Sequence, residues 1–531
     1  MTYISRSLEG RLAENLQMLP AVFVGGARQA GKSTLVKHLA QAGTGWGYAT
    51  FDDIATFASA TRDPEQFVER LKKPAIIDEV QLVPGVFRVL KRWIDELRAA
   101  GKGEANGLFL LTGSADALVV PELTDALVGR IAVLSLYPLS ASEALASGTA
   151  VINGWFDQEI EISDLGTDPR QSIGNLLNRA TFPEISGATE AATAAWFDGY
   201  LTSVLQRDVR QIVEVERTSE LPNVLSVLAS RTGGLLNDSD CARDAKLSVT
   251  TFRRYRALME RLFLVTAIPP WHRNIGKRFV KAPKLYFTDT ALLCHQLGVG
   301  VQSLRRQNPS LFGRVLENFV ATELIKQLSV TPGATLHHFR THDGQEADFV
   351  IERRNSTLLG IEVKAGATVS ADDFKGLEKL RAAAGDDFVR GIVLYAGAKT
   401  LPFGDRLIAM PIEGLWKFDM AIKTDGELKC VNMSDVFFWA NYGRTTRVRC
   451  VVPGEVIRDH FADGATGPKA VRSVKRHWEV IWPALQRKIR EGRIEIVAHD
   501  HEQAIDARRF QKELQVVLDA RDFGNIDYRR A

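Results

Sequence analysis

The feature that most constrains this chain is a glycine-rich octapeptide set between an apolar run and a helix-like segment. It fits the pattern G-x-x-x-x-G-K-[ST] and consists of Gly26, Ala27, Arg28, Gln29, Ala30, Gly31, Lys32 and Ser33. Residues 21–24 before it are all apolar, which predicts a buried strand, and residues 34–40 after it are typical of a helix. In that context backbone N–H groups and the helix N-terminus point at one place, which predicts a phosphate-binding loop.

Individual residues of this loop have distinct expected roles at a bound nucleotide. The backbone from Gly26 to Thr34 is expected to surround the phosphates. Lys32 would reach the β- and γ-phosphates, and the Ser33 hydroxyl would ligate Mg²⁺. The alternative, a glycine-rich turn that contains Lys-Ser by chance, does not explain the strand and helix on either side.

Two further apolar runs end in residues suited to the same site. Residues 74–77 predict a short strand that ends in Asp78 and Glu79. Asp78 is expected to hold Mg²⁺ through water and Glu79 to orient the attacking water. Residues 108–111 predict another strand, and the Thr112 and Ser114 that follow could sense the γ-phosphate. Strands alternating with helices favour a parallel sheet with helices on both faces.

At this point the chain resembles a family: the AAA+-type ATPases of bacteria and archaea that carry a restriction-endonuclease-like C-terminal domain. The resemblance covers roughly residues 1–418 and is carried by short motifs. These are Tyr3-Ile4-Ser5-Arg6, the loop from Gly26 to Thr34, Asp78-Glu79-Val80-Gln81, Leu111-Thr112-Gly113-Ser114, Gly129-Arg130 and Pro138-Leu139-Ser140. The resemblance implies ATP as the nucleotide and ATP hydrolysis as the activity.

In such ATPases an arginine often completes the site of a neighbouring subunit, which implies a homo-oligomer. Arg130 is the best-placed candidate by its motif for a finger acting in trans. Arg28 and the pair Arg207 and Arg210 compete with it, and the sequence does not rank them.

Length and composition bound the class of protein. At 531 residues the chain is too long for one core, and several domains are expected. With 45% hydrophobic and 25% charged residues, each of them can bury a core. Four cysteines without Cys-x-x-Cys spacing favour neither a disulfide framework nor a zinc site, so the expected location is the cytoplasm. No apolar run approaches the length of a membrane span, so no membrane partner is expected.

The net charge of +3 is unevenly distributed. Residues 241–288 contain eleven Lys and Arg against two acidic residues, a net +9, which is typical of a polyanion-binding module. The segment predicts a helix near 235–245, a turn, and a second helix over 252–262 that buries Phe252, Tyr255, Leu258, Met259 and Leu262. Two extended pieces follow, one around 273–278 and one over 284–287, which together suggest a winged helix. The cations expected to contact DNA are Arg253, Arg254, Arg256, Lys277 and Arg278. The alternative is a solvated helix in a lid subdomain.

A second constellation lies at 311–364. Residues 312–324 predict an amphipathic helix with Glu317 at the edge of its apolar face, and 346–352 and 358–364 predict two strands. Asp348 followed by Glu362-x-Lys364 resembles the PD-(D/E)xK nuclease motif. The resemblance implies that Asp348 and Glu362 bind Mg²⁺, that Glu317 assists, and that Lys364 orients the attacking water. The alternative is an inert scaffold of the same fold, since alternating charges are common on a solvated strand.

The expected fold class is α/β with four parts. They are a P-loop parallel-sheet ATPase domain (1–190), a helical lid and winged-helix subdomain (191–304), a restriction-endonuclease-like α/β domain (305–418), and a small C-terminal α+β module (434–531) after a linker (419–433). The last module, with strands near 436–440 and 447–452 and a final helix near 501–518, has no predicted chemistry.

Two hypotheses for function follow from these patterns. The first is an ATP-dependent protein that engages DNA, with nucleotide state gating DNA contact or cleavage. The second is a nucleotide-switched signalling or scaffold protein whose nuclease-like domain is inert.

Overall fold

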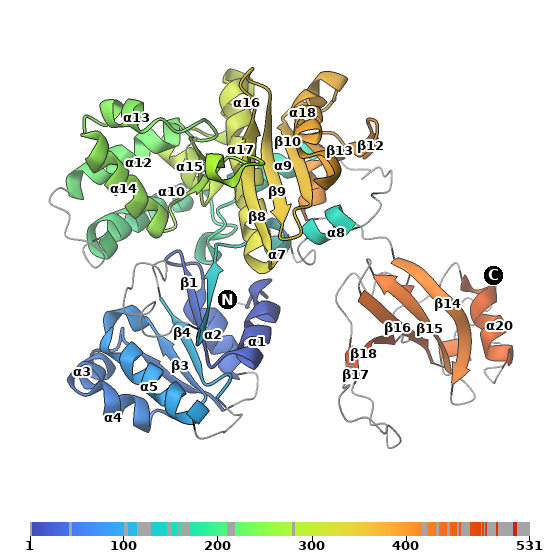
Figure 1. Ribbon diagram of the computed structural model, residues 1–531, viewed down its shortest axis with the longest axis horizontal. Helices are drawn as coiled ribbons and strands as arrows, with labels where there is room; N and C mark the ends of the chain where they lie inside the picture. Colours follow the sequence, from blue (N-terminus) through green and yellow to red (C-terminus); the bar gives the residue numbers. More distant parts are fainter. Residues whose placement is uncertain are drawn as a thin grey trace. The chain divides into compact units, whose positions relative to one another are not determined.

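The computed structural model describes residues 3–41, 45–99, 105–113, 129–145, 151–157, 160, 169–209, 218–278 and 282–416, and short segments between 422 and 517. It divides into two compact units (Figure 1). The larger comprises Met1–Ile152 and Ile162–Trp416, and the smaller comprises Asn153–Glu161 and Lys417–Ala531.

The first sheet of the larger unit has five parallel strands in the order β2-β3-β4-β1-β5. The strands are β1 (Ala21–Gly26), β2 (Gly47–Thr50), β3 (Ala75–Asp78), β4 (Phe109–Thr112) and β5 (Ile131–Leu136). The predicted parallel sheet is therefore confirmed. Because the strands run in one direction, the residues that follow β1, β3 and β4 meet at the same edge.

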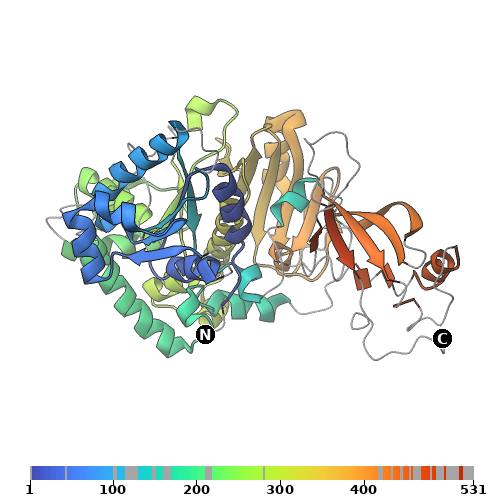
Figure 2. The ribbon, with the colours of Figure 1, turned by 90° about the horizontal axis from the view of Figure 1, so that it is seen from below.

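Helices cover both faces of this sheet, as the alternation of strands and helices predicts (Figures 1 and 2). One face packs on α3 (Ile54–Arg62), α4 (Pro64–Arg70) and α5 (Gly85–Ala99), with Phe23 and Ile77 in the shared core. The other packs on α1 (Leu8–Met18) and α2 (Lys32–Gln41), with Val22, Val24 and Ile76 buried there. Successive strand residues thus point to opposite helical layers, so the strands are held on both faces, including at the edge where β1, β3 and β4 end.

A helical region follows the first sheet. Its helices include α9 (Pro169–Asn178), α10 (Glu190–Ser203), α12 (Leu221–Ser230), α13 (Asp238–Asp244), α14 (Val249–Arg261), α15 (Thr290–Leu297) and α16 (Val301–Gln307). Strands β6 (Val265–Ile268) and β7 (Lys284–Phe287) form an antiparallel hairpin directly after α14.

The apolar face predicted for the second helix of this region is correct. Phe252, Tyr255, Leu258, Met259 and Leu262 are all buried. The extended piece expected around 273–278 is wrong in part, because Ile275–Arg278 form a 3-10 turn. The Asn274 side chain accepts a hydrogen bond from the Gly276 N–H, a local bond that favours a turn over a strand.

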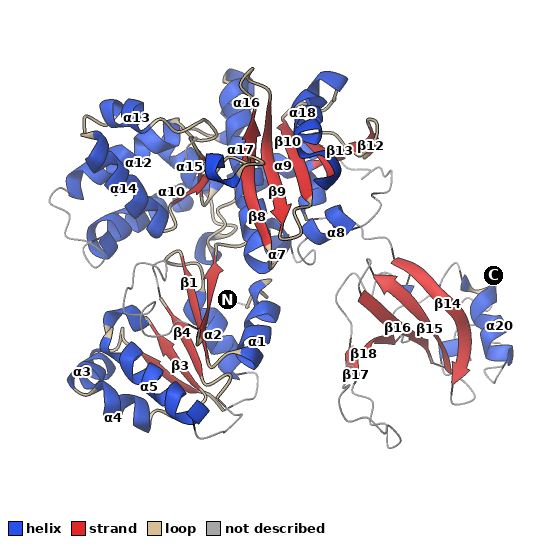
Figure 3. Ribbon diagram, viewed as in Figure 1, coloured by secondary structure: helices blue, strands red, loops and turns tan. Residues whose placement is uncertain are grey.

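The second sheet of the larger unit is mixed and has six strands in the order β12-β13-β11-β10-β9-β8 (Figure 3). They are β8 (Ala334–Arg340), β9 (Glu346–Arg353), β10 (Leu358–Lys364), β11 (Phe388–Tyr395), β12 (Leu401–Pro402) and β13 (Leu407–Pro411). Strands β10, β11 and β13 are parallel, and the other pairings are antiparallel. The 22-residue helix α17 (Pro309–Val330) precedes the sheet, and α18 (Lys375–Ala384) packs directly over Gly360 of β10.

The smaller unit contains a five-stranded sheet in the order β14-β15-β16-β18-β17 and the helix α20 (Pro468–Arg476). Its strands are β14 (Ile422–Val431), β15 (Asp435–Tyr442), β16 (Thr446–Val452), β17 (Glu495–Val497) and β18 (Glu513–Val517). The linker predicted over 419–433 is wrong for Ile422–Val431, which form β14 and pair with β15, because pairing with a neighbouring strand makes this segment the edge of the sheet. The predicted final helix is wrong at 513–517, where β18 pairs with β16.

Candidate functional site

The glycine-rich loop leaves the end of β1 at the edge where β3 and β4 also end. Gly26 has φ of +151°, and a Cβ there would lie 2.1 Å from the carbonyl oxygen of Leu136 in β5. Only glycine lets the loop begin so close to the neighbouring strand. Helix α2 starts at Lys32, so the backbone N–H groups of its first turn face the loop.

Lys32 points back into its own loop. Its side chain is 5% exposed, and Nζ donates to the carbonyl oxygens of Gly26 at 3.1 Å and Ala27 at 3.0 Å. The ammonium is therefore held at the centre of the loop, where the phosphates of a nucleotide would lie. Binding of a nucleotide would exchange these carbonyl contacts for phosphate oxygens.

Asp78 at the end of β3 collects three hydroxyl donors. Ser33 donates to Oδ1 at 3.1 Å, Tyr48 donates to Oδ2 at 2.8 Å, and Thr112 also donates to Oδ1. Asp78 is 3% exposed, so these bonds orient a carboxylate with little solvent around it. The Ser33–Asp78 pair joins the oxygen ligands that Mg²⁺ prefers.

Glu79 takes up the left-handed backbone conformation, with φ of 56° and ψ of 43°. Its N–H donates to the Thr112 hydroxyl at 3.3 Å, and Gln81 donates to its Oε2 at 2.5 Å. A non-glycine residue held in this region costs about 1 kcal/mol, and such strain is concentrated at functional sites. Thr112 thus contacts both acidic residues, whereas Ser114 lies outside the described residues.

Two contributors to this site were not singled out from the sequence. Tyr48 on β2 is a donor to Asp78, and burial together with that carboxylate raises the pKa of its phenol. Arg6 is 6% exposed and donates to the carbonyls of Ala30 at 2.8 Å and Tyr137 at 2.6 Å. Its Nε lies 3.2 Å from Glu143, so one guanidinium joins the loop to the segment after β5. The only sequence signal for Arg6 was its place in a family motif.

Arg130 lies at the opposite edge of the sheet from the loop. It directly precedes β5, its carbonyl accepts from the N–H of Ala21 at the start of β1, and its Nε donates to Asp95 at 2.6 Å. The structure therefore does not bring Arg130 to the nucleotide site of its own chain. Arg28 is half-buried in the loop itself. Arg210 and the side chain of Arg207 lie outside the described residues.

The second constellation, from α17, β9 and β10, is brought together. Asp348 Oδ2 accepts the N–H of Val363 at 2.9 Å, which joins β9 to β10 beside Glu362. Glu362 Oε1 accepts from Lys364 Nζ at 2.9 Å. Both acids are largely buried, and burial, then Asp348, raise the pKa of Glu362 well above its usual range. We call Glu317, Asp348 and Glu362 the acidic cluster.

A lysine not singled out as a site residue occupies the acidic cluster. Lys284 Nζ, from the β6–β7 hairpin, lies 3.0 Å from Glu317 Oε1 and 3.2 Å from Asp348 Oδ1. Tyr286 on the same strand donates to Glu317 at 2.6 Å. As arranged, the cluster does not fit a divalent ion, because an ammonium stands between two of its three carboxylates. Within the described residues, no three His, Cys, Asp or Glu side chains are grouped as metal ligands.

The cations expected to contact DNA are partly engaged within the protein. Arg253 and Arg256 pair with Asp238, at 2.7 and 3.4 Å, and Arg256 also pairs with Glu260 at 2.5 Å. Arg278 pairs with Glu352 of β9 at 2.5 Å. Arg253 and Arg254 remain exposed on α14, and the side chain of Lys277 lies outside the described residues. The positive charge that residues 241–288 present to solvent is therefore smaller than their net charge of +9, because some of their arginines are paired with acidic residues outside the segment.

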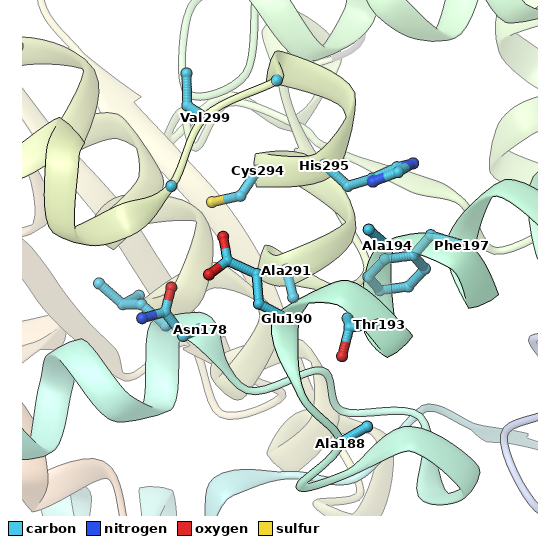
Figure 4. A pocket seen from close by; sticks show the side chains of 13 residues that line it. Asn178, Ala188, Glu190, Thr193, Ala194, Phe197, Ala291, Cys294, His295 and Val299 are labelled. Atoms are coloured by element: carbon cyan, nitrogen blue, oxygen red, sulfur yellow. The ribbon is translucent and has the colours of Figure 1, made fainter.

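A separate cavity of about 390 Å³ lies among α9, α10 and α15 (Figure 4). Asn178, Glu190 and Cys294 line it. Burial, then Asp289, raises the pKa of the Cys294 thiol to about 12, so this cysteine is not a nucleophile near neutral pH. Neither the loop nor the acidic cluster contributes to the cavity.

Comparison with known proteins agrees with the first of these sites. Residues 19–145 match the family described as "AAA domain". With the sheet order and the loop, this match identifies the region as a P-loop ATPase domain of the AAA type. Residues 170–303 and 312–415 match two domains of unknown function, DUF8612 and DUF4143.

Relatives that match two thirds or more of the chain are themselves described as uncharacterized. Protein Rv2008c of Mycobacterium tuberculosis is 28% identical over 77% of this chain and 83% of its own length. A protein of Haemophilus influenzae is 25% identical over 67% of this chain and 86% of its own.

Among solved structures, a Walker-type ATPase of Pyrococcus abyssi is 14% identical, covers 56% of this chain and 96% of its own, and has a TM-score of 0.33. In the part of the chain that the structure describes, no helix has the length and apolar character to cross a membrane.

Proposed function

We propose that this chain is a Mg-ATP-hydrolysing ATPase whose nucleotide state controls an attached DNA-facing module. The observation that carries the proposal is the contact of the loop hydroxyl with the strand-end carboxylate, Ser33 to Asp78 at 3.1 Å, beside the loop-centred ammonium of Lys32. This arrangement supports nucleotide binding with Mg²⁺ held by Ser33 and, through water, by Asp78.

Different residues of the chain have different roles in hydrolysis. Lys32 binds the phosphates, and Glu79, held by Thr112 and Gln81, orients a water molecule. Mg²⁺, when bound with ATP, neutralises charge that develops on the phosphate oxygens. Arg6 fixes the loop backbone, so the phosphate-binding N–H groups are preorganised.

Substitution of Lys32 tests this site. Lys32→Ala should abolish ATP binding, measured by calorimetry, and ATP turnover with it. Lys91→Ala is the matched control, because Lys91 lies on α5 of the same domain and is exposed. Normal turnover in Lys32→Ala would contradict the assignment.

The DNA-facing part of the proposal is supported by the order α13, α14, β6, β7 and by the exposed cations of α14. DNA affinity should then fall steeply as salt rises. Charge reversal of Arg253, Arg254 and Lys277 should weaken DNA binding, whereas reversal of the exposed Arg62, Lys91 and Arg98 on α3 and α5 should not. If the two triple variants bound DNA with equal affinity, the proposed contact of this segment with DNA would be wrong. Arg278 is left unchanged because it pairs with Glu352.

Helix α17 supports communication between the two sites. Near its C-terminal end Lys326 donates to the Leu139 carbonyl at 2.9 Å, and Glu323 accepts the Ala141 N–H at 2.8 Å. Those residues follow β5, in the segment that Arg6 joins to the loop. About two turns earlier on the same helix, Glu317 belongs to the acidic cluster. One helix therefore carries a residue of the acidic cluster and also contacts the segment that Arg6 joins to the nucleotide loop.

A second candidate is a nucleotide-switched scaffold whose nuclease-like domain is inert. The position of Lys284 between two carboxylates favours it. DNA stimulation of ATP hydrolysis separates the two candidates, since only the DNA-engaging protein should show it. If the first candidate also cleaves DNA, Lys364→Ala should abolish cleavage and leave ATP turnover intact, whereas the scaffold should cleave no DNA with or without Lys364.

A further inference from the structure

The acidic cluster already contains a cation, and it comes from another part of the fold. Lys284 is 3% exposed and lies within 4 Å of Glu317, Asp348 and, at 3.9 Å, Glu346. The side chain is therefore a charged ammonium among carboxylates.

The protein supplies a donor to each oxygen of Asp348. Oδ1 faces the Lys284 ammonium, and Oδ2 accepts the N–H of Val363 at 2.9 Å. Glu317 Oε1 accepts from both Lys284 and Tyr286. By contrast, Glu362 Oε2 is buried and has no hydrogen-bond partner within the described residues. A cation that approaches Glu362 would therefore meet an Asp348 in which each carboxylate oxygen already accepts a hydrogen bond.

The β6–β7 hairpin that carries Lys284 is bonded to the edge strand β8. His338 of β8 donates its N–H to the Pro269 carbonyl at 3.0 Å, and its own carbonyl accepts the Trp271 N–H at 2.6 Å. Arg278, between the two hairpin strands, pairs with Glu352 of β9. These contacts hold the hairpin, and hence the ammonium, against the second sheet.

We propose that Lys284 is an internal cation lock: it keeps divalent ions out of the acidic cluster while the β6–β7 hairpin is docked on β8. An ammonium and a divalent ion about 3 Å apart repel too strongly to share three carboxylates. This inference rests on the proposed function in one respect, the interpretation of the cluster as a potential metal site.

Binding of Mn²⁺ alone to the full-length, nucleotide-free protein tests the lock, by calorimetry and by electron paramagnetic resonance. Lys284→Met should create a site with about tenfold or greater tighter binding than wild type, and Asp348→Asn in that background should remove it. Lys375→Met is the matched control, since Lys375 carries the same charge, lies on α18 beside the second sheet and is exposed. No gain of Mn²⁺ binding in folded Lys284→Met would overturn the proposal.

Loss of Lys284 leaves the carboxylates of Glu317 and Asp348 without an ion-pair partner, so this variant could fail to fold. In that case, Mn²⁺ binding to the wild-type protein tests the lock. Its Mn²⁺ binding should be unaffected by Asp348→Asn, and a wild-type site that Asp348→Asn abolishes would show that the cluster is open. Lys284→Arg, which keeps the charge, should behave as wild type.

Assays of ATP turnover and DNA binding on the same proteins distinguish a failure of the proposed function from a failure of the cation lock. Failure of DNA binding contradicts the proposed function and leaves the lock standing. An open cluster in wild type with normal ATP turnover overturns the lock alone.

Discussion

Thr112 is the residue through which the two acids of the ATPase site are connected. Its hydroxyl donates to Asp78 and accepts the Glu79 N–H. Thr112→Val keeps the shape and removes both bonds, so kcat should fall about tenfold, a loss of about 1.4 kcal/mol, with little change in KM for ATP. Steady-state kinetics measure this, with the exposed Thr202→Val on α10 as control. A rise in KM alone would mean that Thr112 serves binding rather than turnover.

His338 gives a prediction about pH. Burial and then Lys284 lower its pKa to about 4, and its Nε2 donates to the Ala282 carbonyl at 3.2 Å. The folded protein therefore holds this histidine neutral, while the unfolded chain takes up a proton near pH 6.5. The free energy of unfolding therefore receives the full contribution of the neutral His338 above pH 6.5. It falls by about 3 kcal/mol as the pH decreases toward 4, because the unfolded chain binds a proton there and the folded protein does not.

Melting temperatures between pH 7.5 and 4.5 measure this loss. The acid-side decline should be shallower in His338→Gln than in wild type. His342→Gln, at an exposed histidine two residues beyond β8, should follow wild type. Identical declines in all three proteins would show that His338 is not responsible.

Single residues also show where sequence reasoning stops. The loop residues, Asp78, Glu79 and the Asp348/Glu362/Lys364 set were found from their spacing along a strand or loop, because each pattern is local. Lys284 and Tyr48 were missed, since their partners lie tens of residues away in the chain. The same limit applies to the segment that we propose faces DNA: a charge count along 241–288 leaves out Asp238 and Glu352, which pair with its arginines.

At the scale of elements, α17 makes a prediction through its buried pair Glu323 and Lys326, 3.2 Å apart. Glu323→Leu or Lys326→Met alone leaves one buried charge and should cost about 3–5 kcal/mol. The double variant should cost less than the sum of the two, because it leaves neither charge unpaired. Thermal unfolding measures the cycle, with exposed Lys379→Met on α18 as control. Additive losses would show that the pair is not coupled.

Elements were predicted well where an apolar period was strong. The buried face of α14 and strands β1, β3 and β4 follow directly from it. Strands β14 and β18 were missed because their pattern is weak in sequence and their identity as strands depends on pairing with β15 and β16.

At the scale of the whole molecule, the position of Arg130 predicts how copies would cooperate. It lies far from its own loop, so a role as an arginine finger requires a second chain. If that role holds, Arg130→Ala and Lys32→Ala should each be inactive alone, and their mixture should recover roughly a quarter of wild-type turnover, since one chain supplies the finger and the other the loop. Turnover should also depend on protein concentration.

The control for the mixture is Lys32→Ala combined with the double variant Lys32→Ala/Arg130→Ala, which offers no intact loop and should stay inactive. Full activity of Arg130→Ala by itself would exclude the finger. The remaining candidates would then be Arg28, Arg207 and Arg210.

The sequence by itself determined the nucleotide loop, its acidic partners and the parallel sheet that brings them to one edge. These follow from short-range rules: a glycine where the backbone needs one, an apolar run where a strand is buried, and a small set of residues that suit phosphate and Mg²⁺. Only the tertiary structure decided what faces the acidic cluster. Lys284 reaches it across the hairpin, 33 residues before Glu317 and 64 before Asp348, because docking on β8 brings the two segments together. Whether those carboxylates can receive a metal ion therefore depends on packing, which spacing along the chain does not encode.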